Sequence, residues 1–322
     1  MDKRLFPLLN TQYGLESVQV LRKLATKGQR EAYLLQTEQG RLVLKVSDPD
    51  RPEEVVRSDI GILDYLARFD FPAPRPVFTR QKRLYLPFEN RFFYLYGFVE
   101  GKMPTPSGKM LHACGALLAT LHSIPVDESA RQSLHRPAYL LDEVKGFLLE
   151  APHTAEQQSM AQDMLAMIAG FPSFEGLPQG LIHTDPYFVN LLDGADGRLY
   201  LIDWDDAGIS YPLIDAGYVG HLATYLPHDR ASLGLAGDEA ITWRPDWAQA
   251  FLDGYQAVRP LTKLEQELFP WAVRLNFLIY TWEWNERRII PENYQRMKIC
   301  DTNLPKVKKP SEGTDAPTAQ GV

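Results

Sequence analysis

The chain has 322 residues, of which 45% are hydrophobic and 23% charged, as is ordinary for a folded protein with a sizeable core. Its net charge of −7 gives no electrostatic support to a nucleic-acid partner, and no stretch has the roughly 20 apolar residues of a membrane helix. The two cysteines, Cys114 and Cys300, form no metal-binding pair, and the N-terminus lacks the apolar core of a signal peptide. We therefore expect a cytoplasmic protein with no nucleic-acid or membrane partner; the sequence indicates no oligomeric state.

The N-terminal part of the chain has the pattern of a β-rich lobe. Alternation of apolar and polar residues predicts strands at residues 17–21, 32–37, 41–46, 84–86 and 92–99. Pro52 begins a predicted helix that extends to about Phe69, with Asp48 or Asp50 as its cap. We assign residues 1–96 to this lobe.

The rest of the chain is predominantly helical in pattern. Helices are expected at residues 111–122, in two stretches around Pro152, and at 213–225, 244–257 and 262–286. The segment 181–207 is the only strand-like part of this half. We assign residues 97–302 to a larger helical lobe and expect the tail, 303–322, to be disordered because it lacks apolar periodicity. The predicted fold class is α+β with two lobes, between which a ligand would bind.

One segment carries a compact set of oxygen ligands. It contains His183-x-Asp185-x4-Asn190, and an apolar run then ends in Asp203. In phosphoryl transfer, one carboxylate orients the attacking hydroxyl, which is the role we predict for Asp185. An amide oxygen and a second carboxylate suit Mg²⁺, which completes its shell with phosphates and water, so Asn190 and Asp203 are the predicted metal ligands. The alternative is a polar turn in which these side chains satisfy backbone groups.

Lys45 lies in an apolar predicted strand, where an ammonium group is costly to bury unless it is paired. The α- and β-phosphates of ATP would provide that partner; the alternative is that Lys45 faces solvent. An acid from the helix at 52–69 would complete the site. Glu53, Glu54 and Asp59 all qualify, and we prefer Asp59 because it lies deepest in the helix.

Other residues have weaker signals. The polar turn at 25–31 contains Gly28, whose backbone could approach phosphates, although an ordinary hairpin turn fits equally well. His183 is more compatible with a brace for its loop than with a proton shuttle. Asp215 is expected to anchor the loop through hydrogen bonds to backbone groups.

Candidate acceptor-binding residues lie beyond the acid set. Asp205 and Asp206 could bind a second Mg²⁺ or a cationic substrate, or could cap the turn before Gly208. Trp282 and Glu283 belong to an aromatic and acidic stretch that could surround a protonated amine, or could simply be part of the core. An overall acidic chain is compatible with a cationic substrate.

Taken together, these motifs resemble the aminoglycoside phosphotransferase/choline kinase superfamily of kinase-like enzymes. The matching segments are Lys45 in its strand, Gly97–Gly101, Leu117–His122, His183–Asn190, Ile202–Trp204 and Pro212–Asp215. In order and spacing they extend over roughly residues 17–290. The resemblance implies a two-lobed protein-kinase-like fold in which Asp185 is the catalytic base, Asn190 and Asp203 bind Mg²⁺, and Lys45 binds the phosphates of ATP.

The resemblance also makes predictions about the lobe connection and shows two departures. It implies that backbone groups around Tyr96 and Phe98 contact adenine. The helix acid that pairs with the lysine is usually a glutamate in this superfamily, whereas the preferred residue here is Asp59. Asp205 stands where choline kinases carry an acid, but the chain has no other close choline-kinase signature.

The implied reaction is transfer of the γ-phosphate of ATP, with Mg²⁺, to a hydroxyl of a small molecule. The acceptor would be an aminoglycoside-like antibiotic, an amino alcohol such as choline, or a homoserine-like metabolite. Two alternatives are a non-catalytic scaffold that retains the fold and a protein Ser/Thr kinase. The intact acid set disfavours the scaffold. The chain also runs directly from Asp203 to Asp215 without an evident activation segment, which disfavours the protein kinase.

Overall fold

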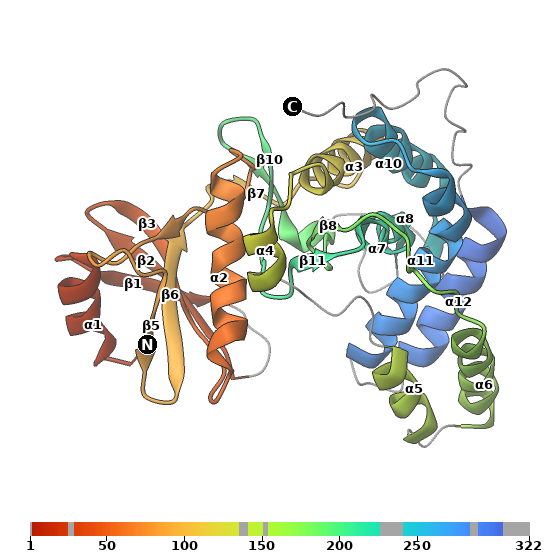
Figure 1. Ribbon diagram of the computed structural model, residues 1–322, viewed down its shortest axis with the longest axis horizontal. Helices are drawn as coiled ribbons and strands as arrows, with labels where there is room; N and C mark the ends of the chain where they lie inside the picture. The colour runs from red at the N-terminus through yellow and green to blue at the C-terminus, as the bar shows by residue number, and fades with distance from the viewer. Residues whose placement is uncertain are drawn as a thin grey trace.

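The computed structural model describes residues 2–24, 29–134, 141–150, 154–225, 241–283 and 289–304. Its N-terminal lobe is built on a six-stranded antiparallel sheet (Figure 1). The strand order is β1 (Gln19–Leu24), β2 (Glu31–Thr37), β3 (Gly40–Val46), β6 (Arg91–Gly97) and β4 (Pro76–Val77), with β5 (Tyr85–Phe88) also paired to β6. All the strands predicted for this lobe are present, with ends shifted by a few residues.

The alternation along the central strands separates the two faces of this sheet. Leu44 and Phe93 are fully buried against the N-terminal helical turns, α1 (Leu5–Leu8) and a π-helix (Leu9–Tyr13). Lys45 pairs in register with Tyr94, and residues paired across antiparallel strands share a face. That opposite face is covered by α2 (Glu53–Ala67), which stands between the sheet and the C-terminal lobe in Figure 1.

The C-terminal lobe consists mainly of helices. They are α3 (Gly108–His122), α4 (Glu128–Ser133), α5 (Leu141–Glu150), α6 (Ala155–Ala169), α7 (Pro212–Gly217), α8 (Val219–Ala223), α10 (Pro245–Val258), α11 (Lys263–Glu283) and α12 (Ile289–Asn303). Three small sheets lie among them: β7 (Gly101–Lys102) with β9 (Leu191–Gly194) and β10 (Leu199–Leu201); β8 (Gly180–Ile182) with β11 (Gly208–Ser210); and β12 (Thr224–Tyr225) with β13 (Thr242–Trp243). A 3₁₀ turn, Phe188–Asn190, follows the Asp185 loop.

The α+β, two-lobed prediction is confirmed, and several details differ. The expectation that 181–207 is the only strand-like part of the second half is wrong, because β7, β12 and β13 are two-residue strands too short to show alternation. The predicted helix at 213–225 is divided into α7 and α8 at Tyr218. No side chain caps α2, and Asp48 pairs with Arg30 instead. The helix α12 was not predicted.

Some predictions stay untested by the structure. The division of the chain at residues 96 and 97 remains a prediction, and residues 305–322 of the expected disordered tail lie outside the described residues. Within the described ranges, the helices are all too short or too polar to span a bilayer.

Helices α3 and α10 approach each other closely because each contributes a glycine to the contact. A Cβ atom added to Gly115 would lie 2.0 Å from the carbonyl oxygen of Phe251, and one added to Gly254 would lie 2.0 Å from that of His112. Backbone atoms cannot yield as a flexible side chain can. The pair therefore fixes the position of α3, which ends at His122 beneath the candidate site.

We expect Gly115→Ala to destabilise the protein by roughly 1–3 kcal/mol or more, because the methyl group must force the two helices apart. Gly146→Ala in α5 is the matched control, since nothing lies within 4 Å of its added Cβ. That change should be neutral or stabilise by up to about 1 kcal/mol. Urea unfolding of both variants measures the difference. Equal stability of Gly115→Ala and the unaltered protein would contradict the close approach.

Candidate active site

The loop that carries Asp185 is held from below by a buried carboxylate. Asp215, in the first turn of α7, is completely buried and accepts hydrogen bonds from the backbone N–H groups of His183 (2.6 Å) and Thr184 (2.8 Å). His122 Nε2 lies 3.1 Å from the same carboxylate. A buried carboxylate is tolerated when such donors surround it. The expected anchoring role of Asp215 is confirmed.

A chain of polar contacts continues from Asp215 into the helical lobe. His122 Nδ1 lies 2.7 Å from the hydroxyl of Tyr255, which accepts a hydrogen bond from Arg259 Nη1 at 3.1 Å. Arg259 in turn forms an ion pair with the buried Glu265 at 2.7 Å. Burial lowers the pKa of His122, while the hydrogen bond to Asp215 opposes this shift. The imidazole is therefore neutral and can donate one proton to Asp215 while it accepts one from Tyr255.

The same loop is tied to the strand that carries Asp203. His183 Nε2 lies 3.0 Å from the carbonyl oxygen of Ile202, and the N–H of Ile202 donates to the carbonyl oxygen of Asn190 at 2.9 Å. The N–H of Asp185 donates to His183 Nδ1 at 3.3 Å. His183 thus bonds through both ring nitrogens, which supports the predicted bracing role. These bonds place Asp203 directly after a residue that is fixed to Asn190.

Two residues beside this junction have left-handed backbone conformations. Thr184 has φ = 75° and Asp203 has φ = 64°, although neither is a glycine. Such a conformation costs of order 1 kcal/mol or more and persists where surrounding contacts enforce it. Here the backbone N–H of Thr184 is bonded to Asp215, and Trp204 packs edge-on against the His183 ring at 4.6 Å.

Asp185 has a defined partner for each carboxylate oxygen. Tyr218 donates its hydroxyl to Oδ1 at 2.5 Å, and Asn190 Nδ2 donates to Oδ2 at 2.9 Å. Desolvation by the surrounding chain raises the pKa of Asp185, and the Tyr218 hydrogen bond opposes that shift. Asn190 donates both bonds to Asp185 from its side-chain Nδ2, so its side-chain oxygen Oδ1 points away from this contact. The carboxylate is therefore held in one orientation at the solvent-exposed edge of the loop.

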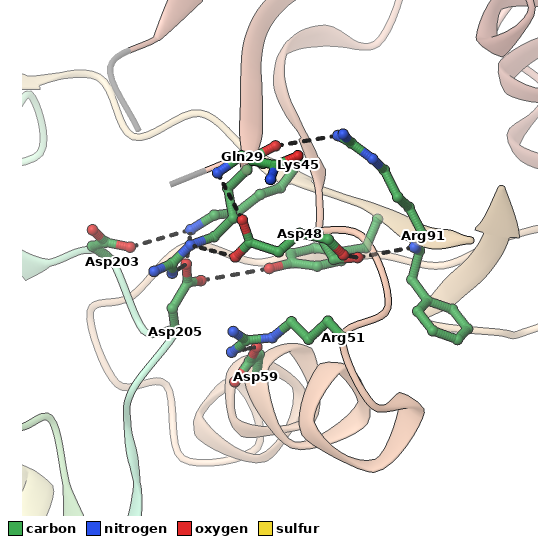
Figure 2. A network of polar contacts seen from close by, with 12 residues as sticks. Gln29, Lys45, Asp48, Arg51, Asp59, Arg91, Asp203 and Asp205 are labelled. Atoms are coloured by element: carbon green, nitrogen blue, oxygen red, sulfur yellow. Dashed lines mark hydrogen bonds and ion pairs between the residues drawn. The ribbon is translucent and has the colours of Figure 1, made fainter. Parts of the chain in front are cut away.

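Lys45 faces the acids of the C-terminal lobe (Figure 2). Its Nζ lies 2.5 Å from Asp205 Oδ2 and 3.2 Å from Asp203 Oδ1. Asp59, which the sequence favoured as the partner of Lys45, forms an ion pair with Arg51 at 2.6 Å. Arg51 lies two residues before the start of α2 and neutralises this helix acid, while Asp205 lies next to the lysine. Asp59 lines the same cavity as Lys45, and its role as the helix acid of the nucleotide site stays a prediction.

These groups surround a small cavity of about 10 Å³, room for about one water molecule. Its walls are formed by Lys45, Asp59, Leu63, Pro74, Tyr94, Tyr96, Asp203, Trp204 and Asp205. Although burial opposes it, the nearby Tyr94 and Asp205 raise the pKa of Lys45 well above its ordinary value, so the amine stays charged. Burial raises the pKa of Tyr96 to about 12, which keeps its phenol protonated.

Part of the backbone that connects the two lobes already forms hydrogen bonds within the protein. The N–H of Gly97 donates to the carbonyl oxygen of Arg75 at 2.8 Å, and the N–H of Phe98 donates to that of Arg41 at 3.1 Å. Adenine binding near Tyr96 and Phe98 stays a prediction. It would have to use carbonyl oxygens of this segment or backbone groups beyond Phe98.

The candidate acceptor ligands are only partly brought to the site. Asp205 is buried and already paired, so it would have to leave its cationic partners to bind a substrate. Asp206 is exposed, and Trp282 is half-buried against the core of the helical lobe. Gly28 and the side chain of Glu283 lie outside the described residues. All four assignments to substrate, and that of Gly28 to phosphate, stay predictions.

The sequence did not predict three contacts of the site: Tyr218 with Asp185, Arg30 with Asp205 and Arg51 with Asp59. Tyr218 follows Asp215 by three residues and so lies on the same face of a helical turn, which is the one sequence signal that could have found it. Arg30 is separated from Asp205 by 175 residues, and no local pattern connects them.

The donor set fits a magnesium ion that is bound mostly by phosphate and water. Within the described ranges, no cluster of three or more His, Cys, Asp or Glu side chains forms a complete metal cage. Mg²⁺ commonly takes only one or two protein oxygens at phosphoryl-transfer sites. Asn190 and Asp203 both carry side-chain oxygens, and the bond between Ile202 and Asn190 keeps them near each other. The side chain of Asp203 is 56% exposed. These two residues would hold the ion.

Comparison with known proteins gives a consistent result. A sequence model of the phosphotransferase enzyme family matches residues 22–261. The homoserine kinase of Chelativorans sp. (strain BNC1) is 28% identical over 292 residues, 87% of this chain and 81% of that one. The homoserine kinase of Methylobacterium radiotolerans is 24% identical over 265 residues, 80% of this chain and 77% of that one.

Solved structures show the same fold. The amicoumacin kinase hAmiN is similar with a TM-score of 0.65 and 15% identity over 95% of both chains. A microcompartment-associated aminopropanol kinase has a TM-score of 0.60 and 18% identity, covering 92% of this chain and 94% of that one. The predicted superfamily and its two-lobed, kinase-like fold are thereby confirmed.

A further buried group lies behind Tyr218. The ring of His221 packs against Tyr218, Phe277 and Tyr280 at centroid distances of 4.9, 4.4 and 4.8 Å. Its Nε2 is buried and has no hydrogen-bond partner among the residues that the structure describes. Burial, together with the nearby Arg296 guanidinium, lowers the pKa of His221 well below its ordinary value. The folded protein thus keeps this histidine neutral.

We expect Asp215→Asn to lower kcat by on the order of 100-fold, because the loss of charge-assisted hydrogen bonds lets the Asp185 loop shift. The same variant should lose roughly 1–3 kcal/mol of stability. Steady-state kinetics with ADP release as the signal, combined with urea unfolding, measures both effects. Asp142→Asn, at an exposed position of α5, is the control and should change neither quantity. Unaltered kcat in a folded Asp215→Asn variant would refute the anchoring role.

The depressed pKa of His221 predicts acid sensitivity of the fold. Below about pH 6.5 an unfolded chain binds a proton at this histidine that the folded chain does not bind. Stability is therefore complete above that pH and falls as the pH decreases toward the folded-state pKa, by at most about 1.4 kcal/mol per pH unit for one histidine. His122 acts in the same direction.

His221→Phe should make the loss of unfolding free energy between about pH 7 and pH 5 less steep, whatever its effect on stability at neutral pH. Urea unfolding across this range gives the slope. His112→Gln, at an exposed histidine of α3, should leave the slope unaltered. An identical slope in His221→Phe and the unaltered protein would contradict a neutral, buried His221.

Proposed function

The chain belongs to the phosphotransferase enzyme family and is a small-molecule kinase that acts on a hydroxyl group, and on this premise we propose that it transfers the γ-phosphate of ATP in the presence of Mg²⁺. The observation that carries the proposal is the Asp185 carboxylate, which Tyr218 and Asn190 hold in one orientation. Asp203 lies beside it through the bond between Ile202 and Asn190. This geometry supports one carboxylate for the hydroxyl and a separate pair of oxygen ligands for a metal.

Each residue then has a distinct task in the proposed reaction. Asp185 orients the acceptor hydroxyl and receives its proton late in the transfer. Lys45 would neutralise phosphate oxygens, and Asn190 and Asp203 would hold the metal ion, which would supply positive charge to the transferred phosphoryl group. Little covalent chemistry is required of the protein, so positioning and charge account for most of the rate.

The relatives support the choice of nucleotide and acceptor. The solved structure of hAmiN is a complex with AMP-PNP and Ca²⁺, an ATP analogue with a divalent cation. Homoserine and aminopropanol, the molecules in the names of two similar kinases, both carry a hydroxyl group and an amine. We therefore propose an acceptor that combines these groups: an amino alcohol, a homoserine-like metabolite or an aminoglycoside-like antibiotic. The intact set of Asp185, Asn190 and Asp203 disfavours a non-catalytic scaffold.

Asp185→Ala should lower kcat by roughly 10²–10⁴-fold or more while AMP-PNP binding survives, because the variant loses the group that aligns the acceptor and keeps the nucleotide ligands. The measurement is ADP release in the presence of a panel of amino alcohols, hydroxy amino acids and aminoglycosides, together with calorimetric titration of AMP-PNP and Mg²⁺. Asp193→Ala, at an exposed carboxylate of β9, is the control and should retain turnover. Turnover by Asp185→Ala at the rate of the control would sink the assignment.

A further inference from the structure

Arg30, the residue before β2, contacts the C-terminal lobe through its side chain. Its Nη1 lies 2.7 Å from Asp205 Oδ2, and its Nε lies 3.3 Å from Asp48 Oδ2. Lys45 approaches the same Asp205 oxygen to 2.5 Å. One carboxylate oxygen of the C-terminal lobe thus lies between two cations of the N-terminal lobe. Arg30 has 21% of its side chain exposed and Lys45 only 9%.

Asp205 is a single carboxylate that is in contact with two cations. The Lys45 ammonium and the Arg30 guanidinium both contact the Oδ2 atom of this buried residue. Tyr94 adds its hydroxyl at 3.5 Å from the other carboxylate oxygen. An oxygen anion held between a lysine and an arginine is the arrangement by which proteins bind phosphate, since the guanidinium offers a planar fork of donors and the ammonium a compact charge.

The space around this oxygen is already filled. The cavity beside Lys45, Asp203 and Asp205 measures only about 10 Å³, so it admits no phosphate group while Asp205 keeps its place. A phosphate that binds Lys45 must therefore displace the Asp205 carboxylate. Arg30 contacts the same oxygen as Lys45, so the displacement exposes both cations to the incoming anion at once.

We propose that Arg30 is a second phosphate-binding residue of this site and that it exchanges Asp205, together with Lys45, for phosphate oxygens of the nucleotide. The inference rests on the proposed use of ATP. It gives this chain a side-chain contact to the phosphates from the region before β2. Asp205 is the internal anion that keeps the two cations paired until that exchange.

The test compares ligands that differ only in their phosphates. Calorimetric titration of the full chain with AMP-PNP and Mg²⁺, and separately with adenosine, gives two dissociation constants for each variant. Arg30→Gln should weaken AMP-PNP binding by roughly 10- to 100-fold, the range for a lost charge-assisted hydrogen bond, and leave adenosine binding unaltered. Arg30→Lys keeps the charge without the planar fork and should lie between Arg30→Gln and the unaltered protein.

Arg274→Gln is the matched control. Arg274 has 23% of its side chain exposed, close to the 21% of Arg30, and forms an ion pair with Asp301 at 2.8 Å within the helical lobe. It should bind both ligands as the unaltered protein does. Thermal unfolding without ligand verifies that each variant is folded.

Two results would overturn the inference while leaving ATP use intact. Arg30→Gln with unaltered AMP-PNP binding would show that Arg30 does not contact phosphate. Equal weakening of AMP-PNP and adenosine would show that Arg30 only fastens the two lobes together. If the unaltered protein itself failed to bind AMP-PNP with Mg²⁺, the proposed nucleotide use would fall, and the role of Arg30 with it.

Discussion

The carboxylate of Asp215 is fully buried in the helical lobe, and three donors converge on it: the backbone N–H groups of His183 and Thr184 and the imidazole of His122. An unpaired charge at this depth would cost several kcal/mol, so the donors and the acid stabilise one another. The arrangement fixes the backbone on which Asp185 stands. It also explains why α3 must pack so closely on α10, since His122 ends α3 and its other nitrogen meets Tyr255 of α10.

The acids of the site are then brought together by backbone bonds rather than by their own side chains. Ile202 uses its carbonyl oxygen for His183 and its N–H for Asn190, so the residue after it, Asp203, has no freedom to move away from the loop. Its left-handed conformation is held in place by the same contacts. Like charges at Asp185 and Asp203 repel, and the rigid backbone, together with the Lys45 ammonium 3.2 Å from Asp203 Oδ1, opposes that repulsion.

The sequence predicted those parts of the molecule that depend on local pattern. Apolar alternation located the strands around Lys45, and the spacing from Asp185 to Asn190 predicted two side chains that the structure brings into contact. It did not predict the contact between Lys45 and Asp205, because these residues are far apart in the chain and meet only when the two lobes pack together. Short features such as β7 also escaped it, since two residues show no period.

Charge balance across the lobes links the fold to the proposed reaction. Lys45 and Arg30 of the N-terminal lobe neutralise Asp203 and Asp205 of the C-terminal lobe, and separating them without replacement would leave buried charges of both signs unpaired. Phosphate alone would satisfy only the cations, and a metal ion alone only the carboxylates. A ligand that carries both signs replaces both sets of partners in one step. The proposed ATP–Mg²⁺ complex is such a ligand, because its phosphates would pair with the two cations and its metal ion with the carboxylates.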